Sequence, residues 1–147
     1  MLVTQMLKVK NQAVEDIVTV VPTATIADAC ALLSTHRIGA LVVSGDGNTP
    51  AGILSERDIV RELGRRGAAV LTLAVSDLMT SNVQTCTAGD DAMEVLDRMT
   101  RGRFRHLPVV DEAGKMVGLV SIGDAVSGRL AELKAEAEAL TGMIMGS

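Results

Sequence analysis

Apolar and polar positions follow one another along the chain in an order that occurs twice. In each half, an apolar stretch and a polar turn precede a segment whose apolar residues recur at helical spacing. Two β-branched runs separated by turn residues come next, and a second helical segment follows. Each half is therefore predicted to fold as β-α-β-β-α. The predicted strands are residues 17–21, 38–44, 52–55, 83–87, 104–110 and 118–121, and the predicted helices are residues 26–35, 57–65, 92–101 and 124–140.

The two halves align without a gap when one is shifted by 66 positions along the other. A unit of this length is too small to bury its own sheet well. We therefore predict an α/β (α+β) fold in which the two units pack their sheets together. The identical pairs include Thr19 and Thr85, Arg37 and Arg103, Leu41 and Leu107, Val43 and Val109, Gly52 and Gly118, Ser55 and Ser121, Asp58 and Asp124, and Val60 and Val126.

The repeat divides the chain into five predicted segments. They are an N-terminal segment, a first repeat, a linker, a second repeat and a C-terminal helical extension, covering residues 1–16, 17–67, 68–82, 83–130 and 131–147. The last predicted helix is longer than its counterpart in the first repeat. Because one compact unit does not need an additional apolar stripe, we expect the stripe on this helix to form a homodimer contact. Its residues are Leu130, Leu133, Ala137 and Leu140.

The composition narrows the classes of function. Apolar residues make up 48% of the chain but include one Phe and no Trp or Tyr, so we expect an aliphatic core and no binding site built from aromatic faces. The formal charge of −4 disfavours a nucleic-acid partner. No apolar run is long enough to span a membrane, and the N-terminus does not resemble a secretory signal, so we expect a cytoplasmic protein. The contexts of Cys30 and Cys86 favour buried thiols over a disulfide or redox switch.

The sequence favours no enzyme class. The two histidines, His36 and His106, occupy dissimilar positions, and the chain has no metal-ligand spacing, phosphate-binding loop or dinucleotide fingerprint. Chemistry by Cys86 with His106 stays as a remote alternative, because neither cysteine has a local activating pattern. We therefore expect no catalytic and no metal-binding residues.

One motif closes each predicted sheet: a glycine, two apolar residues, a serine and, three residues later, an aspartate. The serines are Ser55 and Ser121, and the aspartates are Asp58 and Asp124. One interpretation is that each pair caps the helix that follows. The other is that a hydroxyl and a carboxylate converge at a strand end to bind a vicinal diol such as a ribose. The two interpretations are compatible, and both stay open.

Residues 101–106 form the one basic concentration in this acidic chain. Arg101 and Arg103 fit a helix C-terminus, where cations stabilise the helix dipole. Arg105 lies beside the predicted site, where a guanidinium suits a phosphate. Arg57 begins a predicted helix and would reach the same anion, although it also fits a solvated first turn.

The doubled motif resembles a tandem pair of cystathionine-β-synthase (CBS) domains. The likeness is carried by Gly52–Asp58 and Gly118–Asp124, with further matches in Arg105–Val110 and Val75–Thr80. It implies a regulatory, non-enzymatic module with pseudo-twofold symmetry and two clefts for adenosine-containing ligands such as AMP, ADP, ATP, NAD or S-adenosylmethionine. No cofactor is then required. The resemblance also implies a disc-like homodimer, and occupancy of the clefts would act through the dimer or an unidentified regulated protein.

By this resemblance, each cleft combines the serine and aspartate of one repeat with strand and turn residues of the other. The first cleft would use Ser55, Arg57, Asp58, Thr85, Thr87, Phe104, Arg105 and His106. The second cleft would use Ser121, Asp124, Thr19, Val21, Ile38, Gly39 and Ala40.

The two implied clefts differ in charge. Arg105 aligns with Gly39, and Arg57 aligns with Gly123, so both arginines belong to the first cleft. We expect that cleft to prefer phosphorylated nucleotides and to serve energy sensing. The second cleft would bind a base and ribose weakly, bind the far half of a dinucleotide, or stay empty. For Phe104, core filling and a place in the first cleft both stay open. The alternative function is a ligand-free structural or interaction module in which the serine and aspartate pairs are only caps.

Overall fold

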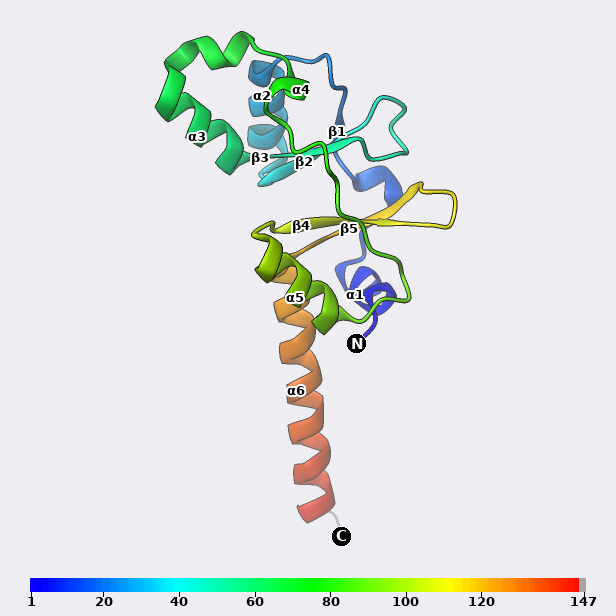
Figure 1. Ribbon diagram of the computed structural model, residues 1–147. Helices are drawn as coiled ribbons and strands as arrows, with labels where there is room; N and C mark the ends of the chain where they lie inside the picture. Colours follow the sequence, from blue (N-terminus) through cyan, green and yellow to red (C-terminus); the bar gives the residue numbers. More distant parts are fainter. Residues whose placement is uncertain (146–147) are drawn as a thin grey trace.

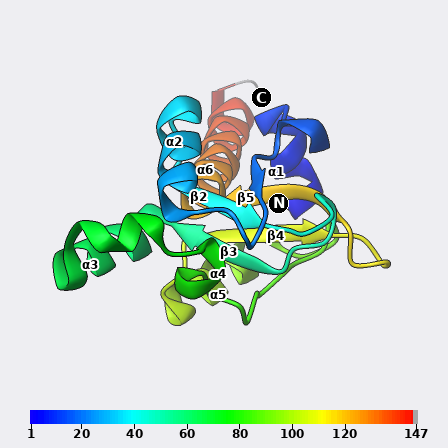
Figure 2. The ribbon, with the colours of Figure 1, turned by 90° about the horizontal axis from the view of Figure 1, so that it is seen from above.

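The computed structural model describes residues 1–145 and has four layers (Figure 1). Helices cover the outer face of each of two small sheets, and the inner faces of the sheets lie against each other. Seen from above, the strands of one sheet lie over those of the other (Figure 2). The predicted α/β (α+β) architecture of two packed repeats is confirmed.

The first half contains a three-stranded sheet in the order β1-β2-β3, with β1 parallel to β2 and β2 antiparallel to β3. Its helices α2 and α3 cover the outer face of this sheet (Figure 1). The elements in chain order are β1 (Thr19–Val20), α2 (Ile26–His36), β2 (Ala40–Val43), β3 (Gly52–Ser55), α3 (Glu56–Arg66), the 3-10 helix η2 (Gly67–Thr72) and α4 (Val75–Leu78).

The second half contains a two-stranded antiparallel sheet, β4-β5. Two elements from the start of the chain, α1 (Val3–Lys10) and the 3-10 helix η1 (Val14–Asp16), pack onto this half: α1 contacts β5 and α6, and η1 contacts β5. The elements that follow the linker are α5 (Ala92–Gly102), β4 (His106–Val110), β5 (Met116–Ser121) and α6 (Ile122–Met145).

The strand predicted at residues 83–87 is wrong. Only Cys86 pairs with the sheet: its amide donates to the Pro108 carbonyl at 3.0 Å, and its carbonyl accepts from the Val110 amide at 2.9 Å. Extending this parallel pairing toward Gln84 would require an N–H from residue 108, and proline has none. In the first half Val42 takes the place of Pro108, and the ladder covers Thr19–Val20.

The glycine that opens each repeated motif lies directly under a side chain from another segment. A Cβ atom on Gly52 would lie 2.5 Å from the sulfur of Met79, and one on Gly118 would lie 2.6 Å from a methyl group of Leu7. The chain after α4 and the chain within α1 therefore take equivalent places, one against β3 and the other against β5.

Each half has its own core of aliphatic side chains and methionines, as the composition predicts. A smaller cluster joins the two sheets through Ile17, Val42 and Met116, each less than 9% exposed. Cys86 is buried, Cys30 is half-buried, and both thiols are free.

The last helix, α6, extends well beyond the body of the protein (Figure 1). It has 24 residues, whereas α3, its counterpart in the first half, has 11. Leu130, Leu133 and Leu140 of the predicted stripe are exposed on it. Across the part of the chain described here, we find no helix with the length and apolar character needed to cross a membrane.

Candidate functional site

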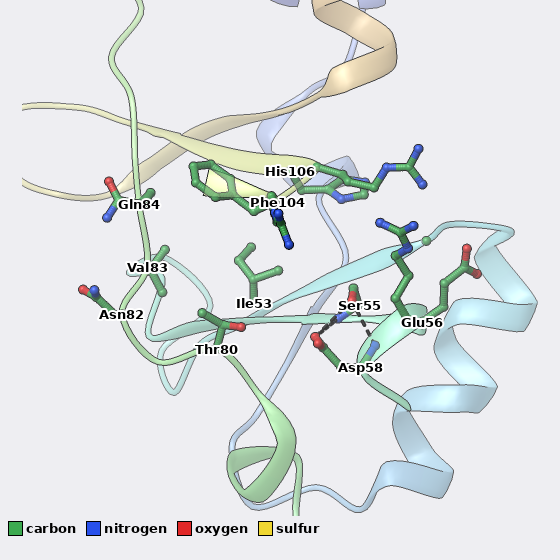
Figure 3. Close-up of a pocket in the computed structure, with 14 residues that line it drawn as sticks. Ile53, Ser55, Glu56, Asp58, Thr80, Asn82, Val83, Gln84, Phe104 and His106 are labelled. Carbon is green, nitrogen blue, oxygen red and sulfur yellow. Dashed lines mark hydrogen bonds between the residues drawn. The ribbon is translucent and has the colours of Figure 1, made fainter. Parts of the chain in front are cut away.

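A cleft of about 170 Å³ opens between the two sheets (Figure 3). One wall comes from the end of β3 and the start of α3, and the opposite wall comes from the residues that lead into β4. The segment between α4 and α5 closes a third side. The lining residues are Gly39, Ile53, Ser55, Glu56, Arg57, Asp58, Thr80, Asn82, Val83, Gln84, Arg103, Phe104, Arg105 and His106.

Ser55 and Asp58 form the polar floor of this cleft (Figure 3). Ser55 Oγ accepts from the Asp58 amide at 3.2 Å, and Asp58 Oδ2 accepts from the Ser55 amide and hydroxyl, both at 3.0 Å. This pair therefore does cap α3. Asp58 Oδ1 accepts from Arg61 at 2.9 Å, and the Asp58 side chain keeps 16% of its exposure. Since a carboxylate has about four acceptor sites, Asp58 can accept further donors from the cleft.

Three arginines surround the cleft: Arg57, Arg103 and Arg105. All three are exposed. Among residues 1–145, none of the three guanidinium groups has a hydrogen-bond or ion-pair partner, whereas Arg101 is paired with Asp97. Arg103 was expected only at a helix C-terminus; it does follow α5, in a left-handed conformation with φ 57°, and it also lines the cleft. Guanidinium groups without partners are available to bind an anion.

The apolar part of the cleft lies between the sheets. Phe104 faces Ile53 across the gap, and Val83 approaches from the linker side (Figure 3). Phe104 also packs partly against the core of the second half. The one aromatic residue of the chain therefore fills the core and lines the cleft, so both interpretations of it hold.

The segment between α4 and α5 supplies lining residues that the sequence analysis missed, namely Thr80, Asn82, Val83 and Gln84. Because Pro108 ends the pairing at Cys86, the chain before Cys86 leaves the sheet and runs along the cleft. Pro108 was the signal that could have placed these residues there.

Several of the residues assigned from the resemblance lie elsewhere than expected. Thr85 and Thr87 do not line the cleft: the Thr85 carbonyl accepts from Arg98 at 2.9 Å, and Thr87 is exposed. Gly39, assigned to the second cleft, lines the first one. A Cβ atom on Gly39 would make an ordinary contact with Glu56, at 3.5 Å from a carboxylate oxygen.

The second half repeats the serine and aspartate geometry. Ser121 Oγ accepts from the Asp124 amide at 3.1 Å, and Asp124 Oδ2 accepts from the Ser121 amide at 2.9 Å. The ammonium group of Lys10, at the end of α1, donates to the same Oδ2 at 2.8 Å and to the Leu119 carbonyl at 2.9 Å. Asp124 lines a smaller cavity of about 120 Å³ between α1 and α6.

The remaining residues assigned to the second cleft line neither cavity. Thr19 pairs with Val42 in the sheet, Val21 is exposed, and Ile38 packs partly against the core of the first half. Ala40 is buried opposite Ser55 in the β2–β3 pair.

Charged residues from both halves of the molecule affect His106. Burial lowers the pKa of His106 below its usual value of 6.5. Lys10 lowers this pKa further, Asp124 raises it, Arg105 lowers it and Glu56 raises it. The pKa of His106 therefore responds to charges from both halves, through Asp124 and through Glu56, the residue that follows Ser55.

Burial raises the pKa of the Cys86 thiol to about 12. Nucleophilic cysteines react as thiolates, so this thiol would be almost entirely protonated near neutral pH. The structure gives the Cys86 and His106 alternative no support.

Both halves of the chain match a known domain family. The profile of the CBS domain matches residues 12–65 and 75–130. The chain therefore belongs to the CBS domain family and carries two copies of the domain. This match indicates no enzyme family.

Individual proteins are also similar to this chain in sequence. The chain is 37% identical over 117 residues to the uncharacterized 17.7 kDa protein in the bps2 3′ region of Acidianus ambivalens, covering 80% of this chain and 70% of that protein. Against several CBS domain-containing proteins of Arabidopsis thaliana it spans 61% or less of the relative's length.

Solved structures show the same fold. The CBS-domain containing protein ATU1752 from Agrobacterium tumefaciens is 39% identical, with a TM-score of 0.81 over 88% of this chain and 99% of that one. The CBS domain protein PAE2072 from Pyrobaculum aerophilum, solved in complex with AMP, is 28% identical, with a TM-score of 0.71 over 84% of this chain and 89% of that one.

Proposed function

We propose that this protein is a non-enzymatic regulatory module that binds an adenine nucleotide in the cleft between its two sheets. The observation that carries the proposal is the convergence on one cleft of the Asp58 carboxylate and three arginines that have no partner among residues 1–145. The carboxylate suits a diol, and the arginines suit a phosphate; an adenine nucleotide carries both groups.

Different residues of the cleft would contact the ribose, the phosphate and the base of the ligand. The ribose hydroxyls would donate to Asp58, which already holds Ser55 in place. The phosphate would lie toward Arg57 and Arg105. The base would enter the apolar slot beside Ile53, Val83 and Phe104, where shape and backbone hydrogen bonds hold it without a full aromatic stack.

The AMP complex of the Pyrobaculum aerophilum protein supports the ligand class, since that protein is a CBS domain protein of the same fold. AMP, ADP, ATP and NAD all present the adenosine and phosphate groups that this cleft would recognise. The three arginines favour ligands with at least one phosphate over adenosine itself.

Calorimetric titration with AMP, ATP and NAD tests this proposal. We expect saturable binding of at least one of the three at ligand concentrations below 1 mM. An absence of binding heat at several millimolar of each would overturn the proposal and favour the ligand-free interaction module, which the capping bonds of Ser55 and Ser121 also allow.

We propose in addition that the module is a homodimer joined through α6. Val126, Leu130, Leu133, Ala137 and Leu140 recur at alternating intervals of four and three residues, and all are exposed. This 3.5-residue period is the apolar seam of a coiled coil. A second copy of α6 offers the matching seam, and Arg129 and Glu136 flank the seam with opposite charges. Nucleotide binding between the sheets would then alter how the two copies meet.

A further inference from the structure

His106 is the lining residue of the cleft between the sheets whose side chain titrates near neutral pH. It is the first residue of β4, pairs with Ser121 of β5, and lies on the β4 wall of the cleft (Figure 3). A Cβ atom on Gly39 would lie 3.9 Å from its Cε1 atom, so the imidazole faces the first half across the gap. Within residues 1–145 the imidazole has no hydrogen-bond partner. Its ring nitrogens are therefore available to a ligand.

Burial is the largest influence on His106, and it lowers the pKa of the imidazole. Lys10 and Arg105 also lower this pKa, whereas Asp124 and Glu56 raise it. These four side chains come from α1, the residue before β4, α6 and α3. Since two cations and two anions oppose one another, burial decides the outcome and favours the neutral imidazole at pH 7.5.

A phosphate in the cleft would change this balance. A phosphate monoester carries up to two negative charges and accepts strong hydrogen bonds from cations. We place the phosphate toward Arg57 and Arg105, and Arg105 directly precedes His106 in the chain. The other charged lining groups are those of Arg103 and Asp58. Arginines keep their charge throughout the neutral range, so His106 is the cation that a phosphate could create.

We propose that His106 takes up a proton from solvent when a nucleotide binds, and that the imidazolium then donates a hydrogen bond to the phosphate. This inference rests on the proposed function of the cleft. Binding would consume at most one proton for each nucleotide, so it would strengthen as the pH falls. The first repeat has Ala40 in the equivalent position, so this response would belong to one repeat only.

The same proton would act on stability with the opposite sign. Without an anion beside it, a buried imidazolium disfavours the folded state, because burial penalises the charged form. With a phosphate beside it, the same charge gains a partner. The nucleotide should therefore stabilise the protein more at lower pH, and the module would respond to nucleotide and proton concentration together.

The test uses the fact that the chain has two histidines, His36 and His106. The variant His36→Asn leaves His106 as the sole histidine, so proton NMR of the imidazole gives its pKa with and without saturating AMP. The variant His106→Asn is the matched control. It leaves His36, which is exposed at the end of α2 and does not line the cleft.

In His36→Asn we expect saturation with AMP to raise the pKa of His106 by about one, which corresponds to a hydrogen bond that favours the protonated form about tenfold. In His106→Asn the pKa of His36 should stay the same. An unchanged pKa of His106, or an equal rise for both histidines, would overturn the inference while leaving nucleotide binding intact.

Calorimetry at pH 7.5 and pH 6.0 gives a second readout. The AMP affinity of His36→Asn should rise about threefold more toward pH 6.0 than that of His106→Asn, since the titration is only partial in this window. The second ionisation of the AMP phosphate is common to both variants and cancels in the comparison. An equal pH dependence would overturn the inference. Absence of AMP binding in both variants and in the unmodified protein would overturn the proposed function together with it.

Discussion

The two halves of the molecule hold the same serine and aspartate in the same local geometry, and they differ in what faces the aspartate. Asp58 lines the larger cleft together with Arg57, Arg103 and Arg105, whereas Asp124 pairs with Lys10 beside a smaller cavity. The hydrogen bonds from the backbone amides within each pair are alike because each pair caps its helix. The motif therefore sets the local shape of both sites. Residues from other segments decide which of the two is open to a ligand.

The two halves differ most in the length of their last helices, α3 and α6. Variants in the proposed dimer seam on α6 test what the additional length does. We expect Leu133→Glu with Leu140→Glu to weaken the dimer at least about 1000-fold, because burying each leucine contributes roughly 1.5–3 kcal/mol and two copies lose theirs together. Light scattering with size-exclusion chromatography measures the mass. Ala135→Glu, on the same helix but off the seam, should stay dimeric; a dimer in the double variant would exclude α6 as the interface.

Replacing each aspartate with alanine tests the difference between the clefts. Asp58→Ala should weaken AMP binding about 100-fold, since charged hydrogen bonds to the ribose are each worth about 1.5–3 kcal/mol. Asp124→Ala is a closely matched control, because it disrupts an equivalent helix start. We expect it to leave the strong site unchanged in a calorimetric titration. Equal losses in both variants would mean that the effect comes from capping rather than from ligand contact.

The arginines sharpen the comparison. Arg57→Ala and Arg105→Ala should each weaken AMP binding about tenfold and leave adenosine binding nearly unchanged, because a guanidinium contributes through the phosphate. Arg65→Ala is the control: Arg65 lies on the same helix as Arg57 and is paired with Glu62. A loss of adenosine affinity equal to the loss of AMP affinity would contradict the placement of the phosphate.

The smallest effect concerns His106, which stands where the first repeat has Ala40. Because burial lowers the pKa of His106 in the folded state, the unfolded chain takes up the proton first as the pH falls. The free energy of unfolding should therefore decrease as the pH drops below about 6.5, the ordinary pKa. Urea unfolding at pH 7.5 and pH 5.5 should show a smaller decrease in His106→Asn than in His36→Asn. An equal decrease would rule out this coupling.

The fold could be predicted because the same pattern of helices and strands occurs in both halves of the sequence. Helices with apolar residues at helical spacing and β-branched strands separated by turn residues leave few alternatives. The strand at residues 83–87 failed because its pairing depends on the missing N–H of Pro108, which a pattern of apolar residues does not show. That failure also hid Val83 and Gln84 from the predicted site.

The contact between Lys10 and Asp124 could not be predicted from the repeat. Lys10 lies before the first repeat and has no counterpart in the alignment of the two halves, so nothing in its spacing connects it with Asp124. The contact arises because α1 packs onto the second half, against β5 and α6. The unequal charge of the clefts, by contrast, followed directly from aligning Arg105 with Gly39 and Arg57 with Gly123.

The central claim is that the two halves share a motif but only the first is an open nucleotide site. A crystal structure grown with one equivalent of AMP tests it most directly. We predict one nucleotide per chain, with its ribose on Asp58, its phosphate between Arg57 and Arg105, and Lys10 still on Asp124. AMP bound at Asp124 while the first cleft stays empty would contradict the account.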